Sequence, residues 1–351
     1  MAEAVMTDAA ARAELAVELA AHNIAVAQPT DPPLFTRTPG SSMVPWHWRA
    51  TELAGLLEKI GANLRLEAGG QRRTLRLANP GLPYGTTPTF WASIQYILPG
   101  EVATAHRHAA TALRFIMRGH GSDTVVDGEL YRMNEGDLVL TPSGTWHDHE
   151  NKGDKPMVWL DVLDISLVRA LHAVSFEGSE APRQPVSRVA DSSFRKFGSG
   201  IMRPPGAVHG VKDGGKASPI LAYGWDRASA ALEQAAGLDP DPFDDSILEY
   251  QNPLTGGPAL PTLGTALQQL RPGSRTRAHR HTGSVVYYAV RGAGRMQVDD
   301  RVFEWGAGDF IALPPWALHS HANEGTEPAV LFQVNDIPVL QALGLHRVEE
   351  G

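Results

Sequence analysis

The sequence predicts a fold dominated by β-structure and built from two similar halves. One observation is a set of four histidines that occurs twice, as His106-Arg-His108 with His147-Asp-His149 and as His279-Arg-His281 with His319-Ser-His321. Another is the spacing, because the first and third histidines of the two sets lie 41 and 40 residues apart. Short apolar runs separated by glycine turns surround both sets, a pattern typical of antiparallel strands. The chain is therefore predicted to contain an internal duplication.

The composition limits the classes of function. A chain of 351 residues with 42% hydrophobic residues is long enough for two domains, each with its own core. The formal net charge of -8 argues against nucleic acid or an anionic membrane as the main partner, so a small ligand is expected. The absence of cysteine means that any metal must be held by nitrogen and oxygen ligands. No membrane span or secretory pattern is seen, and a cytoplasmic protein is expected.

Residues 1–85 are predicted to form an N-terminal helical arm. Apolar residues at helical spacing predict a docking helix over residues 8–22, with Asp8 as its N-cap, and a second helix over 50–64. The tryptophans at 46 and 48 and the basic patch at 72–73 are interpreted as packing and subunit contacts.

Residues 86–178 are predicted to form the first β domain, which carries the first set of four histidines. Asp127-Gly128 predicts a two-residue hairpin turn within it. The predicted strands are short apolar runs, namely 90–97, 113–117, 123–126, 130–133, 138–140 and 157–162.

Residues 179–255 have a weaker pattern and are predicted to be a linker that contains one helix near 228–236. The β pattern returns in residues 256–351, with glycine turns in the places of those in the first half. A short closing helix is expected over 338–345.

The histidines are arranged to share a cavity. Residues two apart on a strand point to the same face, so His106 and His108 project together, as do His147 and His149. A glycine lies six residues before each HxH pair, and each second pair follows a glycine and a proline at matching distances. This frame is similar to the cupin pattern. It implies a bicupin, with two antiparallel β-barrel (jelly-roll) domains together with N-terminal and linker helices.

One departure from that pattern bears on the chemistry. Cupins usually carry a glutamate after the HxH pair, but the corresponding positions are Ala112 and Leu113 in the first half and Val285 and Val286 in the second. Three neutral histidines would leave a divalent metal with its full charge and open coordination positions. Such a site would attract an anionic chelating ligand, such as a carboxylate beside a phenol hydroxyl.

Several longer segments resemble gentisate 1,2-dioxygenases over roughly residues 34–335. The most specific are His106-Arg-His108, Ala112-Leu-Arg-Phe115 and Trp146-His-Asp-His149. The resemblance implies an Fe(II)-dependent homotetramer that cleaves an aromatic ring between its carboxyl-bearing and hydroxyl-bearing carbons, with gentisate giving maleylpyruvate. Relatives in the same group accept salicylate, substituted salicylates or 1-hydroxy-2-naphthoate, and these substrates are kept as alternatives. O2 is the second substrate.

The resemblance also assigns roles to residues. It implies His106, His108 and His147 as iron ligands and Arg114 as the partner of the substrate carboxylate. It also implies that Gln95 and His149 form hydrogen bonds with substrate or oxygen, and that His149 is a proton donor or acceptor. Asp161 would orient an imidazole or Arg114, and Trp91 would form a wall of the pocket. Ser93 and Val162 are larger than the residues expected at their positions, which bears on the size of the ring that fits.

The second half keeps His279, His281 and His319 as a second candidate metal site, but Tyr287 stands at the position of Arg114. Catalysis is therefore placed in the first half. Two other classes of protein remain open on the residues alone, a metal cupin enzyme that is not an oxygenase and a binding bicupin without catalysis. Imidazole ligands do not distinguish iron from manganese, nickel or zinc.

Overall fold

The computed structural model describes residues 9–26, 33, 35–64, 73–198, 202, 204 and 215–351. The chain divides into two compact units, residues 1–39 and 40–351. The first unit contains helix α1 (Ala9–Ala21), which confirms the helix predicted there. The proposed N-cap, Asp8, lies outside the described residues, as does Arg72 of the basic patch.

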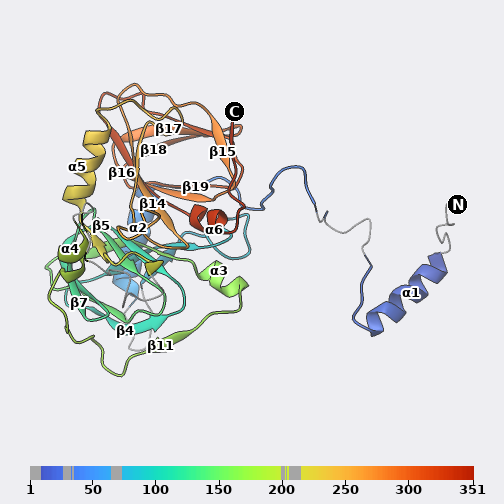
Figure 1. Ribbon diagram of the computed structural model, residues 1–351, viewed down its shortest axis with the longest axis horizontal. Helices are drawn as coiled ribbons and strands as arrows, with labels where there is room; N and C mark the ends of the chain where they lie inside the picture. The colour runs from blue at the N-terminus through green and yellow to red at the C-terminus, as the bar shows by residue number, and fades with distance from the viewer. Residues whose placement is uncertain are drawn as a thin grey trace. The chain divides into compact units, whose positions relative to one another are not determined.

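The second unit contains two pairs of antiparallel sheets, one pair for each half of the duplication (Figure 1). In the first half a six-stranded sheet has the order β12-β8-β5-β10-β3-β2, and a five-stranded sheet has the order β11-β4-β9-β6-β7. Their strands are β2 (Thr74–Arg76), β3 (Trp91–Ile97), β4 (Val102–His108), β5 (Ala112–Arg118), β6 (His120–Val126), β7 (Glu129–Asn134), β8 (Leu138–Thr141), β9 (His147–Glu150), β10 (Met157–Leu163), β11 (Phe176–Gly178) and β12 (Ala222–Tyr223).

The second half repeats this arrangement. Its six-stranded sheet has the order β1-β19-β16-β21-β14-β13, and its five-stranded sheet has the order β18-β17-β20-β15-β22. Their strands are β1 (Trp46–Trp48), β13 (Ser246–Glu249), β14 (Gly264–Leu270), β15 (His279–His281), β16 (Val285–Arg291), β17 (Ala293–Val298), β18 (Arg301–Gly306), β19 (Phe310–Leu313), β20 (His319–Ala322), β21 (Ala329–Asn335) and β22 (Val348–Glu350). The prediction of two antiparallel β domains is confirmed.

Five helices belong to the described part of the second unit. They are α2 (Ala50–Asn63), α3 (Ile165–Ala170), α4 (Ser192–Phe197), α5 (Trp225–Ala235) and α6 (Ile337–Ala342). Helices α2, α5 and α6 match the predicted ones, whereas the short helices α3 and α4 were not predicted, because six residues are too few to show a helical period. No helix in the described residues is long and apolar enough to cross a membrane.

The arm and the linker contribute strands to the sheets. These strands were not predicted, because the alternation of apolar residues in both segments is weak. Strand β1 pairs with β19 of the second half, and β2 pairs with β3 of the first. The linker strands β12 and β13 extend one six-stranded sheet each. Such short segments become strands because an open sheet edge offers unpaired backbone groups. Arg73 is 2% exposed and forms an ion pair with Glu101, which agrees with the packing role expected for that residue.

The predicted hairpin turn is present. Asp127 and Gly128 have φ values of 45° and 82°, and they connect the paired residues Val126 and Glu129 of β6 and β7. Positive φ at both central residues is the requirement of a type I′ turn, which matches the twist of the strands.

One hydrophobic core joins the two halves. It combines side chains from the outer faces of both six-stranded sheets, and the rings of Phe115 and Phe332 stack at a centroid distance of 4.1 Å. Val162 belongs to this core and is fully buried in it. Since the residues of β10 alternate between faces, Val162 points away from the histidines, and the expectation that it limits the ring-binding pocket was wrong.

Two buried carboxylates also connect the halves, each in the same manner. Asp164 follows β10 and accepts hydrogen bonds from the backbone N–H of Thr111 in its own half and from Thr262 Oγ1 at 2.6 Å in the other. Asp336 follows β21 and accepts from the Ser284 N–H and from Thr89 Oγ1, also at 2.6 Å. The duplication therefore produces a reciprocal pair of aspartate–threonine contacts.

Candidate metal centre

Three histidines of the first half come together at one point. His106 on β4 lies opposite His147 on β9, and His108 follows two residues later on the same face of β4. The three side chains each offer one ring nitrogen, and these nitrogens lie within 4.8 Å of one another. Their ring centroids are 4.1 to 5.5 Å apart. This spacing suits three ligands of a single metal ion.

The backbone sets the orientation of each ring. The Nδ1 atoms of His106, His108 and His147 lie 2.8, 2.7 and 3.0 Å from the carbonyl oxygens of nearby residues. A carbonyl only accepts hydrogen bonds, so each Nδ1 carries a proton, and in the neutral form of each ring Nε2 has the lone pair. Metal-binding histidines are commonly oriented in this way.

His147 shows most directly that the cluster fits a metal. Its Nε2 is buried and has no hydrogen-bond partner among the described residues. Burial lowers the pKa of His147 well below its usual value, and the positive charges of Arg114 and of the other two histidines lower it further. The ring is therefore neutral at pH 7, which is the form that binds metals.

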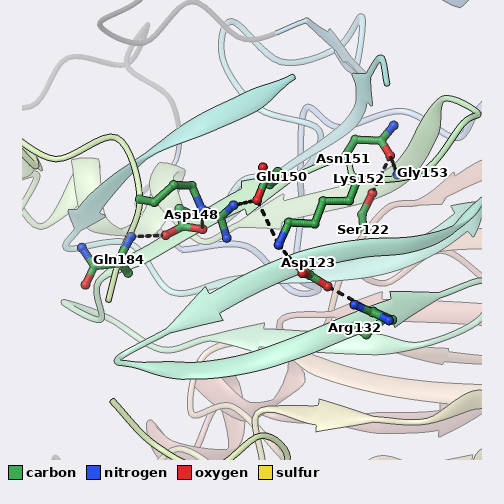
Figure 2. Close-up of polar contacts among 10 residues, drawn as sticks. Ser122, Asp123, Arg132, Asp148, Glu150, Asn151, Lys152, Gly153 and Gln184 are labelled. Carbon is green, nitrogen blue, oxygen red and sulfur yellow. Dashed lines mark hydrogen bonds and ion pairs between the residues drawn. The ribbon is translucent and has the colours of Figure 1, made fainter. Parts of the chain in front are cut away.

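The alternation of β9 separates the cavity from a polar outer surface. His147 and His149 are fully buried on the cavity side. Asp148 between them points to the other side, where it is also fully buried because the linker covers it, and it accepts hydrogen bonds from Arg183 Nε at 2.8 Å and from the Gln184 backbone. Figure 2 shows Asp148 and Glu150 within a network that continues through Lys152 to Asp123 and Arg132. The outward residues of β9 thus hold the strand that supplies the third ligand.

The motif asparagine after β9 has a structural role. Asn151 donates to the carbonyl oxygens of Ile97 and Lys155, and its Oδ1 accepts from Gly153 N and Ser122 Oγ. The contacts with Ser122 and Gly153 are visible in Figure 2. Asn323 makes the matching contacts in the second half, to Leu270, Glu327 and Gly325.

The other predicted site residues lie on the central strands of the six-stranded sheet. In the register of β3, β10 and β5, Gln95 is opposite Trp159, Ser93 is opposite Asp161, and Asp161 is opposite Arg114. Residues directly opposite each other point to the same face, which here is the face away from the core between the halves. Trp91 is on that face too, four residues before Gln95. The ring of Trp91 packs edge-on against Tyr84.

Arg114 places a positive charge in the interior. Its side chain is 1% exposed, Nη1 donates to Thr141 Oγ1 at 2.6 Å, and Nε lies 3.4 Å from Asp161 Oδ1. Burial lowers the pKa of Arg114, and the charge of Asp161 partly opposes this effect. The ion pair is too long for a good hydrogen bond, so Arg114 keeps donor capacity for a further anion.

Several polar atoms in this part of the interior lack protein partners. Both amide atoms of Gln95 and the indole nitrogens of Trp91 and Trp159 are buried without a hydrogen bond in the described chain. Buried polar groups are rarely left unsatisfied unless they serve a ligand. The arrangement is therefore suited to an anionic, oxygen-rich ligand.

His149 is close to the same groups. Its ring is fully buried, 5.9 Å from the ring of His147 and 5.3 Å edge-on from that of Trp159. It stands one alternation beyond the third ligand, where it can exchange a proton with a bound ligand.

A second cluster occurs at the matching place in the second half. The ring nitrogens of His279, His281 and His319 also lie within 4.8 Å of one another. Burial is the main reason that the pKa of His281 falls to about 4, and it lowers the pKa values of His279 and His319 as well. Tyr287 and Gln333 take the places of Arg114 and Asp161 there, and the described residues place no buried lysine or arginine beside this cluster.

A recess of about 560 Å³ lies elsewhere, between β7 and the linker helices α4 and α5. Its half-buried carboxylate, Asp137, accepts hydrogen bonds from the backbones of Asn134 and Trp225. This carboxylate joins the linker to the first half, and none of the predicted site residues lines the recess.

Sequence reasoning missed three residues that the structure adds. Trp159 and Thr141 belong to the surroundings of Arg114 and Gln95, and Asp244 of the linker contacts Gln268 near the second cluster. The period-two spacing from Trp159 to Asp161 places both on one face and was available in the sequence. The contacts of Thr141 and Asp244 depend on segments distant in the chain, for which the sequence contains no comparable pattern.

A family model described as "Cupin domain" matches the chain twice, over residues 93–163 and 266–335. These ranges run from β3 to β10 in the first half and from β14 to β21 in the second, and they leave out the edge strands that the arm, the linker and the C-terminus add. The match confirms the prediction of a bicupin.

Individual relatives cover most of the chain. A 5-aminosalicylate 1,2-dioxygenase from Comamonas sp. is 40% identical over 86% of this chain and 80% of its own length. A gentisate 1,2-dioxygenase from Streptomyces sp. is 37% identical over 91% and 89%. A solved structure of salicylate 1,2-dioxygenase from Pseudoaminobacter salicylatoxidans, described as adducts with gentisate, superposes with a TM-score of 0.90 at 32% identity and covers 99% of this chain and 96% of that one.

Proposed function

Because the chain belongs to the gentisate 1,2-dioxygenase family of ring-cleaving bicupin oxidoreductases, we propose that it is an Fe(II)-dependent dioxygenase acting on gentisate. The reaction opens the ring between the carboxyl-bearing and hydroxyl-bearing carbons, adds both atoms of O2, and yields maleylpyruvate. Salicylate, substituted salicylates and 1-hydroxy-2-naphthoate are the alternative substrates.

One observation carries the proposal. The first half combines three clustered imidazoles with a buried arginine and the Gln95 amide, and neither His147 Nε2 nor that amide has a hydrogen-bond partner among the described residues. The imidazoles suit a divalent metal, the guanidinium suits a carboxylate, and the amide suits a hydroxyl or oxygen group. A hydroxylated aromatic carboxylate has all of these groups on one rigid frame.

The residues of the chain hold the substrate in a fixed position. The Arg114 guanidinium binds the carboxylate, and Asp161 and Thr141 orient that guanidinium through their contacts with Nε and Nη1. The Gln95 amide and the indole of Trp159 provide hydrogen bonds to oxygen substituents of the ring. The side chain of Trp91 forms one wall of the pocket. Such positioning reduces the entropic part of the barrier.

His106, His108 and His147 would hold the iron through Nε2, since their Nδ1 atoms are bonded to the backbone. When bound, ferrous iron supplies the one-electron chemistry that reactions of O2 require. His149 accepts the proton of the phenol hydroxyl as the substrate binds, and it returns a proton as the ring opens. The buried walls limit the entry of water.

The ring substituent is the point at which relatives differ. Ser93 lies on the pocket face opposite Asp161, where its side chain takes space that a glycine would leave open. The Ser93 hydroxyl can form a hydrogen bond with a small group at the 5-position of the ring, such as the hydroxyl of gentisate or the amino group of 5-aminosalicylate.

The test is anaerobic reconstitution with Fe(II), followed by oxygen uptake with gentisate, 5-aminosalicylate, salicylate and 1-hydroxy-2-naphthoate in parallel. We expect one O2 consumed per gentisate, with a new ultraviolet-absorbing ring-opened product. Faster uptake with one of the other acids would reassign the substrate. No uptake with any acid, in protein shown to hold iron, would contradict the dioxygenase assignment.

We also propose that the enzyme is a cytoplasmic homotetramer, on the basis of its family resemblance. Light scattering coupled to size-exclusion chromatography would measure the mass in solution. A mass near that of one chain, 37.8 kDa, would contradict the tetramer.

A further inference from the structure

The second histidine cluster keeps the features of a metal site. His281 and His319 have Nδ1 bonded to the carbonyl oxygens of Gly283 and Ala317, each at 3.0 Å, which leaves Nε2 as the ligand atom. The Nε2 of His319 is buried, and the described residues offer it no hydrogen-bond partner. This is the same combination of backbone-oriented rings and an orphaned nitrogen that His147 shows in the first half.

The cavity beside this cluster differs from the first because part of the linker occupies it. Gln268 stands on β14 where Gln95 stands on β3, and its Nε2 donates to the backbone oxygen of Asp244 at 3.0 Å and to Asp244 Oδ1 at 3.3 Å. The ring of Phe243 lies 5.1 Å from that of His279. An intramolecular carboxylate and an aromatic ring thus take the place that a ligand would take beside Gln95.

The segment that carries these groups, Asp241–Asp245, is firmly held and is called the plug loop below. Asp241 and Asp245 exchange two backbone hydrogen bonds, and Asp241 Oδ1 accepts from the N–H groups of Phe243 and Asp244. The buried Asp245 carboxylate accepts from the N–H and Nε of Arg271. Because β13 begins at Ser246 and pairs with β14, the sheet register itself places the plug loop over Gln268.

We propose that His279, His281 and His319 bind a divalent transition-metal ion with a structural role, and that the plug loop closes this site to aromatic acids. The three imidazoles provide the nitrogen ligands that such ions prefer. Tyr287 replaces the arginine that would bind a carboxylate, and Asp244 and Phe243 occupy the space that a ligand would need beside Gln268 and His279. The inference is independent of the substrate and of any activity of the first half.

Cobalt(II) is a suitable probe because its visible absorption reports both binding and the exchange of ligands. Metal-free full-length protein is titrated with Co²⁺ for the wild type, His106→Ala, His279→Ala and the double variant. We expect two tight equivalents per chain for the wild type, one for each single variant and none for the double variant. His319→Asn serves as a second variant of the second cluster if His279→Ala does not fold, as judged by circular dichroism.

Salicylate is then added to the two single variants. It should shift the cobalt spectrum of His279→Ala, in which only the first site is loaded, and leave that of His106→Ala unchanged. Adding Phe243→Ala and Asp244→Ala to His106→Ala should produce a shift where none occurred before. Loss of tight binding in His106→Ala would overturn the metal site, and a salicylate shift in that variant would overturn the plug loop.

Discussion

In the proposed function, Arg114 selects the ligands that the first half accepts. A buried guanidinium needs a compensating anion, and Asp161 at 3.4 Å supplies only part of that compensation. A substrate carboxylate would complete the set, which explains why an arginine is retained in an otherwise apolar strand. The proposal therefore predicts that the pocket selects its ligands first by charge and then by ring substituent.

Replacing Arg114 with alanine should leave iron bound but weaken binding of the substrate carboxylate. The loss of a charge-assisted contact is worth about 1.5–3 kcal/mol, which corresponds to a KM increase of roughly 10- to 100-fold. Steady-state oxygen uptake and iron content measure the two effects. Arg114→Lys is the matched control, because lysine keeps the charge but cannot bind a carboxylate through two parallel hydrogen bonds. Its KM should lie between that of the wild type and that of Arg114→Ala. An unchanged KM in Arg114→Ala would refute this role.

His106→Ala should abolish both iron retention at the first site and oxygen uptake. The ring supplies one of three ligands, and the remaining two are insufficient to hold a divalent ion tightly. The iron content of the protein is measured by elemental analysis after gel filtration, and oxygen uptake is measured on the same sample. His120→Ala is the control, because His120 is an exposed residue at the start of β6. Full turnover by the His106 variant would move the catalytic site elsewhere.

A second observation at the residue scale concerns Trp316, which replaces the motif glycine of the second half. Its φ is +66°, and its N–H donates to the carbonyl of His281 at 2.7 Å, just as Gly144, with a φ of +71°, donates to His108. A bulky residue in this region is strained. The surrounding sheet therefore imposes this turn before His319 and His321, even though tryptophan does not favour a positive φ.

At the scale of elements, short linker segments are held against strands of both halves. The plug loop is fixed by β13, a four-residue strand, and Asp148 of β9 is fixed by Arg183 and Gln184 of the linker. In both places a segment without a strong pattern of its own positions a functional element.

The plug loop should make stability depend on pH in metal-free protein. Burial, and secondarily the charge of Asp241, raises the pKa of Asp244 from 3.8 to about 7. In the folded state this carboxyl therefore binds a proton that the unfolded chain has already released between pH 4 and 7. The stability from this group is fully present below pH 4 and is lost as the pH rises to 7.

Asp244→Asn should remove this dependence and be more stable than the wild type at pH 8, by about 1–2 kcal/mol after allowing for the partial exposure of the side chain. The amide keeps an oxygen that can accept the hydrogen bond from Gln268. Urea unfolding at pH 5 and pH 8 measures the difference, and Asp239→Asn at an exposed linker position is the control. Parallel pH profiles for the variant and the wild type would contradict the raised pKa.

At the scale of the whole molecule, the duplication is used to join the halves. Phe115 and Phe332 stack across the shared core, and the two aspartate–threonine contacts repeat the same connection in opposite directions. Each contact satisfies a buried carboxylate of one half with a hydroxyl of the other, so separating the halves would expose both apolar surface and two unsatisfied carboxylates.

Thr262→Val should therefore destabilise the protein by about 1.5–3 kcal/mol, because it removes a hydrogen bond to the buried Asp164 carboxylate while keeping the volume of the side chain. Thr262→Ser restores the hydroxyl and should recover most of the loss. Thr89→Val tests the reciprocal contact with Asp336. Urea unfolding followed by tryptophan fluorescence measures all three. A Thr262→Ser variant as unstable as Thr262→Val would show that the hydroxyl is not responsible.

The histidine ligands, the strands that carry them and the duplicated fold could all be predicted from the sequence, because they follow from local period and from motif spacing. Residues two apart share a face of a strand wherever the strand lies. The turn at Asp127-Gly128 is likewise a property of two adjacent residues. The roles assigned to Arg114, Gln95, His149, Asp161 and Trp91 remain predictions, although the structure places these residues on the inner walls beside the histidines.

Contacts between distant segments were decided only by the tertiary structure. The sequence by itself determined which residues could face a cavity, whereas the sheet register decided that Ser93 faces it and that Val162 lies in the core between the halves. The pairing of β1 with the second half and the entry of Asp244 beside Gln268 join residues far apart in the chain. Such contacts depend on which edges and cavities the folded sheets leave open, and no local pattern encodes that choice.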